Sequence, residues 1–200
     1  MPYAFCIIAL QFANSLFSVK AQTLENGITL QDIKAAFPEL ANKLSSGEKL
    51  EIKYHSGTPE LDGKIKAVGD VQIDYYRGFY PEINGKLKAV DNIVFDYYTS
   101  NFYPEIKGKL KSIGGYEITY YTGNFYPEIK GKVKSIGNTE ITYFTGDFYP
   151  EIKGKVKTIG NATITYHTGD FYPNLKGRLK SIDGRITNKL VFLFDELVDL

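Results

Sequence analysis

The sequence predicts a mainly β protein: an array of 23-residue β-hairpin repeats that forms an elongated antiparallel meander. The first observation is the repeat itself, because Phe-Tyr-Pro and a following glycine recur at 23-residue steps. The second is that each step contains two short runs rich in Ile, Thr and Tyr, such as 109–113 and 117–122, with turn residues between them. The third is that equivalent positions keep their residue type along the array. The repeated residues are Phe79, Phe102, Phe125, Phe148 and Phe171, and Gly85, Gly108, Gly131, Gly154 and Gly177.

The turn between the two runs decides which side chains share a face of the sheet. A three-residue turn at 114–116 pairs Leu110 with Tyr120 and Ser112 with Ile118, and places these four side chains together. We therefore predict this register, with the serine beside the tyrosine on the buried face. A β-solenoid with one coil per repeat is the alternative fold, since it stacks the same residues as ladders.

The chain divides into four segments. Residues 1–21 read as a signal peptide, because no charge occurs before Lys20, an apolar run follows Ala4, and Val19 and Ala21 are small residues before a cleavage point. Residues 22–49 form a short helical lead that begins after Thr29. Residues 50–182 are the repeat domain, and residues 183–200 are a capping segment, helix or strand, that we expect to cover the open end. This organisation predicts a protein that is secreted, periplasmic or at the cell envelope.

Composition excludes several chemistries. Lys and Arg number 24 against 23 Asp and Glu, so the formal charge of +1 gives no overall attraction to nucleic acid. One cysteine and two histidines leave too few ligands for a zinc site, and no phosphate-binding loop motif occurs. We expect no cofactor, no metal, no nucleic acid partner and no integral membrane span in the mature chain.

The unit Tyr121-Thr-Gly-Asn-Phe125, followed by Gly131 and Val133, loosely resembles the MORN repeat. The likeness covers residues 64–178, but Gly131-Lys132-Val133 lacks the second glycine of that pattern, and the Pro-Glu pair has no MORN counterpart. The chain is also similar to secreted bacterial β-repeat proteins with Lys-x-Lys-Ser-Ile-Gly and Tyr-Tyr units. That resemblance implies a hairpin array and export, and implies no activity.

The repeated aromatic pairs are the candidate ligand-binding residues, because Tyr and Phe beside a rigid proline offer contact area at low entropic cost. Two packings remain open: rings that face a ligand, or a Phe beneath its own hairpin with the Tyr covering it. The pairs are Phe79 and Tyr80, Phe102 and Tyr103, Phe125 and Tyr126, Phe148 and Tyr149, and Phe171 and Tyr172.

We predict a non-catalytic, exported binding or structural module that contacts a glycan or an envelope protein through these loops. The first alternative is a polyanion or membrane-surface binder that uses a lysine ladder. The second is a hydrolase that uses one of the repeated carboxylates, such as Glu105 or Glu128. The ladder residues are Lys109, Lys111, Lys132, Lys134, Lys155 and Lys157.

Overall fold

The structure is a computed structural model that describes residues 23–25, 28–44, 51–169, 173–194 and 197. The predicted signal peptide, residues 1–21, lies outside the described residues, as do Phe171 and Tyr172 of the last aromatic pair.

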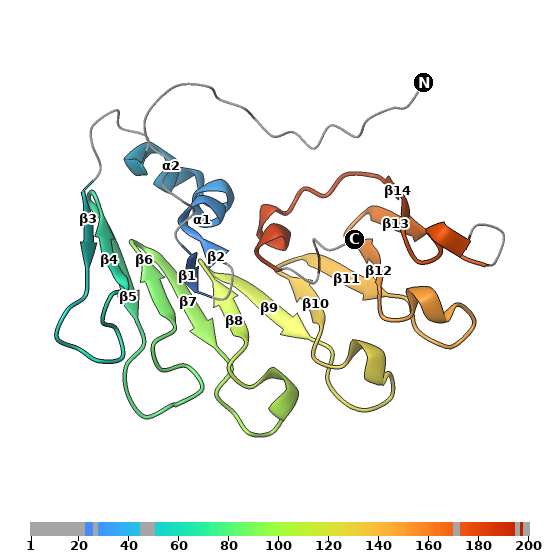
Figure 1. The fold of residues 1–200 in the computed structure, drawn as a ribbon, viewed down its shortest axis with the longest axis horizontal. Helices are drawn as coiled ribbons and strands as arrows, with labels where there is room; N and C mark the ends of the chain where they lie inside the picture. The colour runs from blue at the N-terminus through green and yellow to red at the C-terminus, as the bar shows by residue number, and fades with distance from the viewer. Residues whose placement is uncertain (1–22, 26–27, 45–50, 170–172, 195–196, 198–200) are drawn as a thin grey trace.

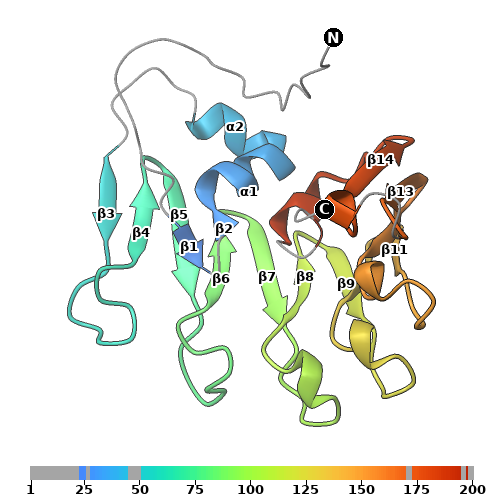
Figure 2. The same ribbon diagram turned by 45° about the vertical axis from the view of Figure 1, so that its right-hand side comes forward.

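Twelve strands form one antiparallel sheet in which every strand pairs with its neighbours in sequence (Figures 1 and 2). This confirms the meander, and the solenoid alternative is wrong because a solenoid needs parallel neighbours. In the described part of the chain the sheet is open, with β3 at one edge and β14 at the other. The strands are β3 (Ile52–Tyr54), β4 (Ile65–Val68), β5 (Val71–Tyr75), β6 (Leu87–Val90), β7 (Ile93–Tyr97), β8 (Leu110–Ile113), β9 (Tyr116–Tyr120), β10 (Val133–Ile136), β11 (Thr139–Tyr143), β12 (Val156–Ile159), β13 (Ala162–Tyr166) and β14 (Leu179–Asp183).

The predicted three-residue turn is wrong. Strand β8 pairs with β9 through Ile113 opposite Tyr116 and Ser112 opposite Glu117, which leaves a two-residue turn at Gly114 and Gly115. Both glycines have positive φ, 54° and 86°, as the tight hairpin turns that match strand twist require. The turn is therefore selected by backbone conformation and not by face alternation.

A β-bulge corrects the predicted faces. Between β9 and β10, Val133 lies opposite Tyr120 and Ser135 opposite Thr119, so one residue of β10 is extra. The bulge brings Val133 and Ile136, three positions apart, onto the same buried face. Ser135 lies on the opposite face, where its hydroxyl is 2.6 Å from that of Thr119. The small residue is thus not beside the buried tyrosine.

The predicted helical lead consists of two helices, α1 (Leu30–Ala36) and α2 (Pro38–Leu44), preceded by a small hairpin of β1 (Thr23–Glu25) and β2 (Ile28–Thr29). Their apolar residues Ile33, Phe37 and Leu40 are buried in the same core as the strands. Lys43 forms an ion pair of 2.6 Å with Asp91 in the β6–β7 turn, and the Phe37 ring lies over Gly114 in the β8–β9 turn. The helices therefore cover the turn end of the hairpins (Figure 1).

The C-terminal segment forms a 3-10 helix, η5 (Lys189–Leu193), that packs against α1 with Leu190, Val191 and Leu193 buried. The side-chain amide of Asn188 donates to the Ile136 carbonyl at 3.0 Å, in the β10–β11 hairpin. In the described residues this segment extends the cover over the turns, because its apolar side chains reach the core there, and most of β14 stays exposed. That the segment caps the open end of the array stays a prediction, since 195–196 and 198–200 lie outside the described residues.

Candidate functional site: the aromatic loops

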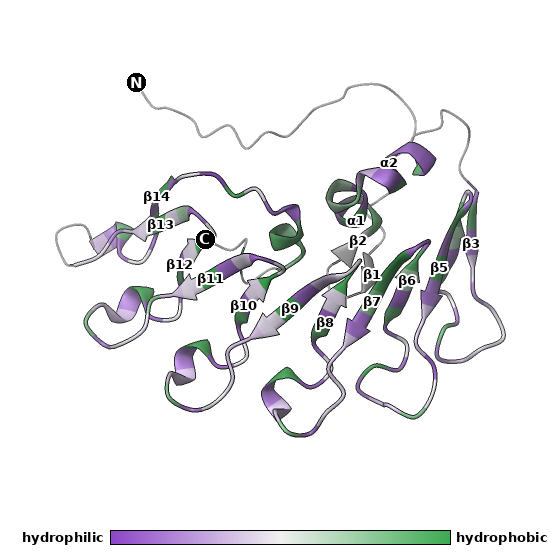
Figure 3. Cartoon of the chain, turned by 180° about the vertical axis from the view of Figure 1, so that it is seen from behind, coloured by the Kyte–Doolittle hydropathy of each residue, from purple (hydrophilic) through white to green (hydrophobic). Residues whose placement is uncertain are grey.

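The Phe-Tyr-Pro motifs lie on the long loops at the end of the sheet opposite the helices (Figures 1 and 3). We call the connections 76–86, 98–109, 121–132 and 144–155 the aromatic loops. Figure 3 shows that hydrophobic and hydrophilic segments alternate along them. All four extend from the same end of the strands and fan out around the curved sheet, so the motifs form a row along that end (Figure 1).

Each aromatic loop is closed at its base by backbone hydrogen bonds. In the third, the Tyr121 amide donates to the Lys132 carbonyl at 2.9 Å, and the Gly131 amide donates to the Tyr121 carbonyl at 2.7 Å. The loop contains the 3-10 helix η2 (Pro127–Ile129), which begins at the proline because proline needs no amide partner there. Ile129 is buried beneath it. The same helix recurs as η1 (Pro104–Ile106), η3 (Pro150–Ile152) and η4 (Pro173–Leu175).

The aromatic pair at the tip of each loop faces solvent. Phe125 is 87% exposed and Tyr126 is 45% exposed, and their rings meet edge to face at 4.8 Å between centroids. The phenylalanine therefore does not pack beneath its own hairpin, and this closes the choice that the sequence left open. Equivalent pairs at the other loops are exposed as well: Phe79 and Tyr80, Phe102 and Tyr103, and Phe148 and Tyr149.

The repeated glutamates connect successive loops. The carboxylate of Glu128 accepts the Gly146 amide of the next loop at 3.1 Å, and Glu105 accepts the Gly123 amide in the same way. Backbone hydrogen bonds, with Lys153 nearby, hold the pKa of the Glu128 carboxyl below its ordinary value. Glu151 repeats the contact with Gly169 at 2.9 Å. This geometry gives each carboxylate a role in positioning the next loop.

The lysine ladder separates into two classes. Lys132 is half-buried: its ammonium donates to the Gly154 carbonyl at 2.6 Å and lies 5.2 Å from the centre of the Tyr143 ring. Lys109 and Lys155 make the same two contacts one repeat away. These three ammonium groups therefore join one hairpin to the next loop. The exposed members of the ladder are Lys111, Lys134 and Lys157.

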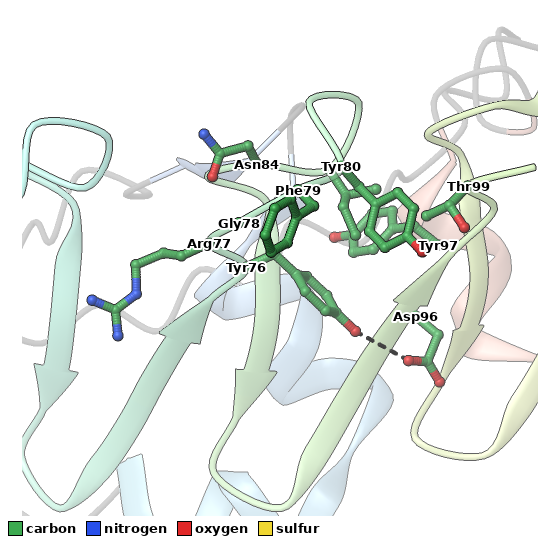
Figure 4. Close-up of a pocket in the computed structure, with 10 residues that line it drawn as sticks. Tyr76, Arg77, Gly78, Phe79, Tyr80, Asn84, Asp96, Tyr97 and Thr99 are labelled. Atoms are coloured by element: carbon green, nitrogen blue, oxygen red, sulfur yellow. Dashed lines mark hydrogen bonds between the residues drawn. The ribbon is translucent and has the colours of Figure 1, made fainter.

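A groove of about 340 Å³ lies beside the first aromatic loop (Figure 4). The rings of Phe79, Tyr80 and Tyr97 line it together with Asp96, and the Arg77 side chain points away from these rings. The Tyr76 hydroxyl lies 3.1 Å from an Asp96 oxygen. Burial, with this carboxylate as a smaller cause, raises the pKa of Tyr76 to about 12, so the phenol is a neutral donor at neutral pH.

The groove was not predicted from the sequence, although two signals mark it. The first loop is one residue shorter than the others, so Phe79 follows Gly78 directly. In addition, Asp96 occupies the strand position at which later repeats have Thr119, Thr142 and Thr165.

Comparison with known proteins gave no match: no protein family, no curated protein and no solved structure is significantly similar to this chain. Within the described ranges, no group of three or more His, Cys, Asp or Glu side chains is placed to hold a metal ion. The described helices include none with the length and apolar character needed to cross a bilayer.

Proposed function

We propose that this protein is a non-catalytic binding module of the cell envelope whose row of aromatic loops binds a repetitive glycan. The observation that carries the proposal is the solvent exposure of the Phe-Tyr pairs, exemplified by Phe125 at 87%. An exposed aromatic ring loses little entropy on contact and can cover the apolar face of a sugar ring.

Rigid presentation supports this function. In the third and fourth loops, the proline, the 3-10 helix and the glutamate of the preceding loop constrain the aromatic pair, as Pro127 and Glu105 do in the third loop. A preorganised surface loses less conformational entropy on binding. Because the pairs repeat along one side, a polymer with repeating units contacts several at once, and weak contacts then sum to avidity.

The first loop gives the row a polar end. The groove there combines the Phe79 and Tyr80 rings with the Asp96 carboxylate and the Asn84 side chain. Sugar hydroxyls donate and accept hydrogen bonds, so this mixture suits a sugar residue better than it suits a purely apolar ligand. We place the most specific contact of the glycan in this groove.

Co-sedimentation of the full chain with insoluble polysaccharides, at low and high salt, tests the proposal. We expect retention that persists at high salt and that falls about ten-fold for each aromatic contact removed, as in Phe125→Ala. The triple variant with Phe102, Phe125 and Phe148 changed to Ala is expected to lose retention. The matched control changes Lys111, Lys134 and Lys157 to Ser and is expected to retain it.

The lysine alternative makes the opposite prediction. If retention on an anionic polymer falls steeply with salt and disappears in the lysine variant, the exposed lysines are the binding surface. If neither polymer retains the protein, a protein partner at the envelope replaces the glycan. Export is tested by the N-terminal sequence of the native protein, which we expect to begin at Gln22.

A further inference from the structure

The two edge strands are the two halves of one repeat hairpin. Residues 51–54, which are Glu51 and the three residues of β3, read Glu-Ile-Lys-Tyr, where β11 has Glu140-Ile-Thr-Tyr143. Residues 179–182 of β14 read Leu-Lys-Ser-Ile, where β10 has Val-Lys-Ser-Ile. Among the described residues, β3 is therefore the second strand of a hairpin that lacks its first strand, and β14 is a first strand that lacks its second.

The pairing registers agree with this assignment. Ile52 lies opposite Val68 and Tyr54 opposite Ile65, with a bulge between them. In the interior, Ile141 and Tyr143 of β11 lie opposite residues of β12 in the same way, also with a bulge between them. Strand β14 pairs with β13 as β12 pairs with β11, again with the bulge in the same place. Both edges therefore present a backbone with the geometry of an interior repeat.

Side chains that are buried in the interior repeats are exposed at these two edges. Ile182 is 42% exposed, whereas Ile136 at the equivalent position is 0% exposed. Tyr54 is 49% exposed, whereas its equivalent Tyr143 is 6% exposed. In the described structure β3 pairs with β4 alone and β14 with β13 alone, and the helices and η5 lie over the turns and not over these edges.

We propose that copies of this chain associate head to tail, with β14 of one copy pairing with β3 of the next to complete a repeat hairpin. The register follows from Ser135 opposite Glu140 in β10–β11, so Ser181 lies opposite Glu51 of the next copy. The occupant is a second copy because its edge has the sequence and the bulge position of the strand that is missing.

The interior repeats specify the contacts at this junction. The Tyr143 hydroxyl donates to the Val133 carbonyl, so the next copy's Tyr54 hydroxyl reaches the Leu179 carbonyl. Lys155 donates to the Gly177 carbonyl and lies over the Tyr166 ring, so Arg178 takes the same place over Tyr54. An arginine stacks on a ring and still donates through its other nitrogens.

Head-to-tail contact uses two different surfaces, so it does not stop at a dimer unless the assembly closes into a ring. The assembly continues the row of aromatic loops from one copy to the next. This inference goes beyond the binding function, since assembly is independent of which ligand the loops bind.

Disulfide trapping between two single-cysteine chains tests the register. Both chains carry Cys6→Ser, one carries Ser181→Cys, and the other carries Glu51→Cys. The predicted pair is of the non-hydrogen-bonded type, with about 4.5 Å between Cα atoms, a distance that a disulfide accepts. On mild oxidation of the mixture we expect a covalent dimer as the main product.

The matched control replaces the second chain by one with Lys53→Cys. Lys53 lies two residues from Glu51 on the same face of β3, so it is the diagonal cross-strand neighbour of Ser181, at about 7–8 Å. We expect at least a ten-fold lower yield of cross-linked dimer there. Equal yields for the two mixtures, or dimers of the Ser181→Cys chain alone in the same yield as the mixture, overturn the head-to-tail register.

Sedimentation velocity of the full chain gives a second, disulfide-free measurement. We expect the mean mass to rise with concentration and Ile182→Lys to hold the protein at the monomer mass, with an unchanged circular dichroism spectrum because Ile182 is exposed in the monomer. A concentration-independent monomer overturns the proposal. Polysaccharide retention is measured separately on the Ile182→Lys variant, so failure of assembly and failure of binding are distinguishable.

Discussion

Replacing Tyr143 by Phe tests whether the buried tyrosines hold the bulged hairpins together. Tyr143 is buried, and its hydroxyl donates to the Val133 carbonyl at 2.9 Å. That carbonyl belongs to the bulge, where the register between strands shifts and the regular ladder is interrupted. The hydroxyl thus adds a hydrogen bond at a place where the regular ladder of the sheet is interrupted.

The magnitude follows from the loss of one buried hydrogen bond with the ring retained. A net contribution of about 0.5–1.5 kcal/mol, plus part of the cost of a less satisfied buried carbonyl, gives an expected loss of about 1–2 kcal/mol in the free energy of unfolding. Urea denaturation followed by circular dichroism measures it. The control is Tyr126→Phe, whose exposed hydroxyl is expected to change stability by less than about 0.5 kcal/mol. Equal effects of the two substitutions would refute the role assigned to the hydroxyl.

The remaining predictions concern strain and pH. Gly154→Ala is expected to lower the free energy of unfolding, measured by urea denaturation, more than Gly146→Ala does. Both glycines have positive φ, but only at Gly154 does a new Cβ meet a carbonyl oxygen, that of Glu128, at 3.0 Å. Equal losses of stability would contradict the crowding argument. Burial raises the pKa of Tyr166 to about 12, above its ordinary 10.0, so the stability that it contributes is complete below pH 10 and is lost as pH rises toward 12. Ultraviolet titration of tyrosinate, with unfolding measured at each pH, checks this. Ionisation of all tyrosines near pH 10 in the folded protein would contradict it. The pKa of the Glu128 carboxyl is lowered, so its contribution is present above its ordinary 4.5 and is lost as pH falls through the depressed value. Amide hydrogen exchange at Gly146, faster at acid pH relative to the intrinsic rate, measures that loss, and protection that does not depend on pH would argue against the contact.

The repeat period was enough to predict the meander, because a unit of two short strands cannot bury its apolar face alone. It was not enough to predict the turn. The prediction required strict alternation of side chains, and alternation fails at the bulge between Val133 and Ser135. The signal was present as two apolar residues, Val133 and Ile136, three positions apart in the same strand. This spacing recurs at Val156 and Ile159, and it indicates one extra residue on the strand.

The aromatic pairs were found from the sequence, but their exposure was not, because the same residue types serve as core and as surface in each repeat. Tyr143 is buried because it ends strand β11 within the sheet, opposite Val156 of β12, whereas Phe148 is exposed because the loop carries it beyond the sheet. Which of these occurs depends on where the loop closes. That is set by backbone hydrogen bonds such as Gly154 amide to Phe144 carbonyl, at 2.7 Å, which residue type alone does not reveal.

Within a repeat, the side chains that join it to its neighbours differ from the exposed aromatic pair, which is why the pair is available for the binding that we propose. The contacts that join one repeat to the next use other side chains: Lys132 with the Gly154 carbonyl, and Glu128 with the Gly146 amide. The tip residues Phe125 and Tyr126 meet each other in solvent, so their replacement leaves these connections in place. Stability is then determined by one set of residues, and the binding that we propose would use another. Loop tips can change from repeat to repeat, as the shorter first loop shows, while the array that positions them stays the same.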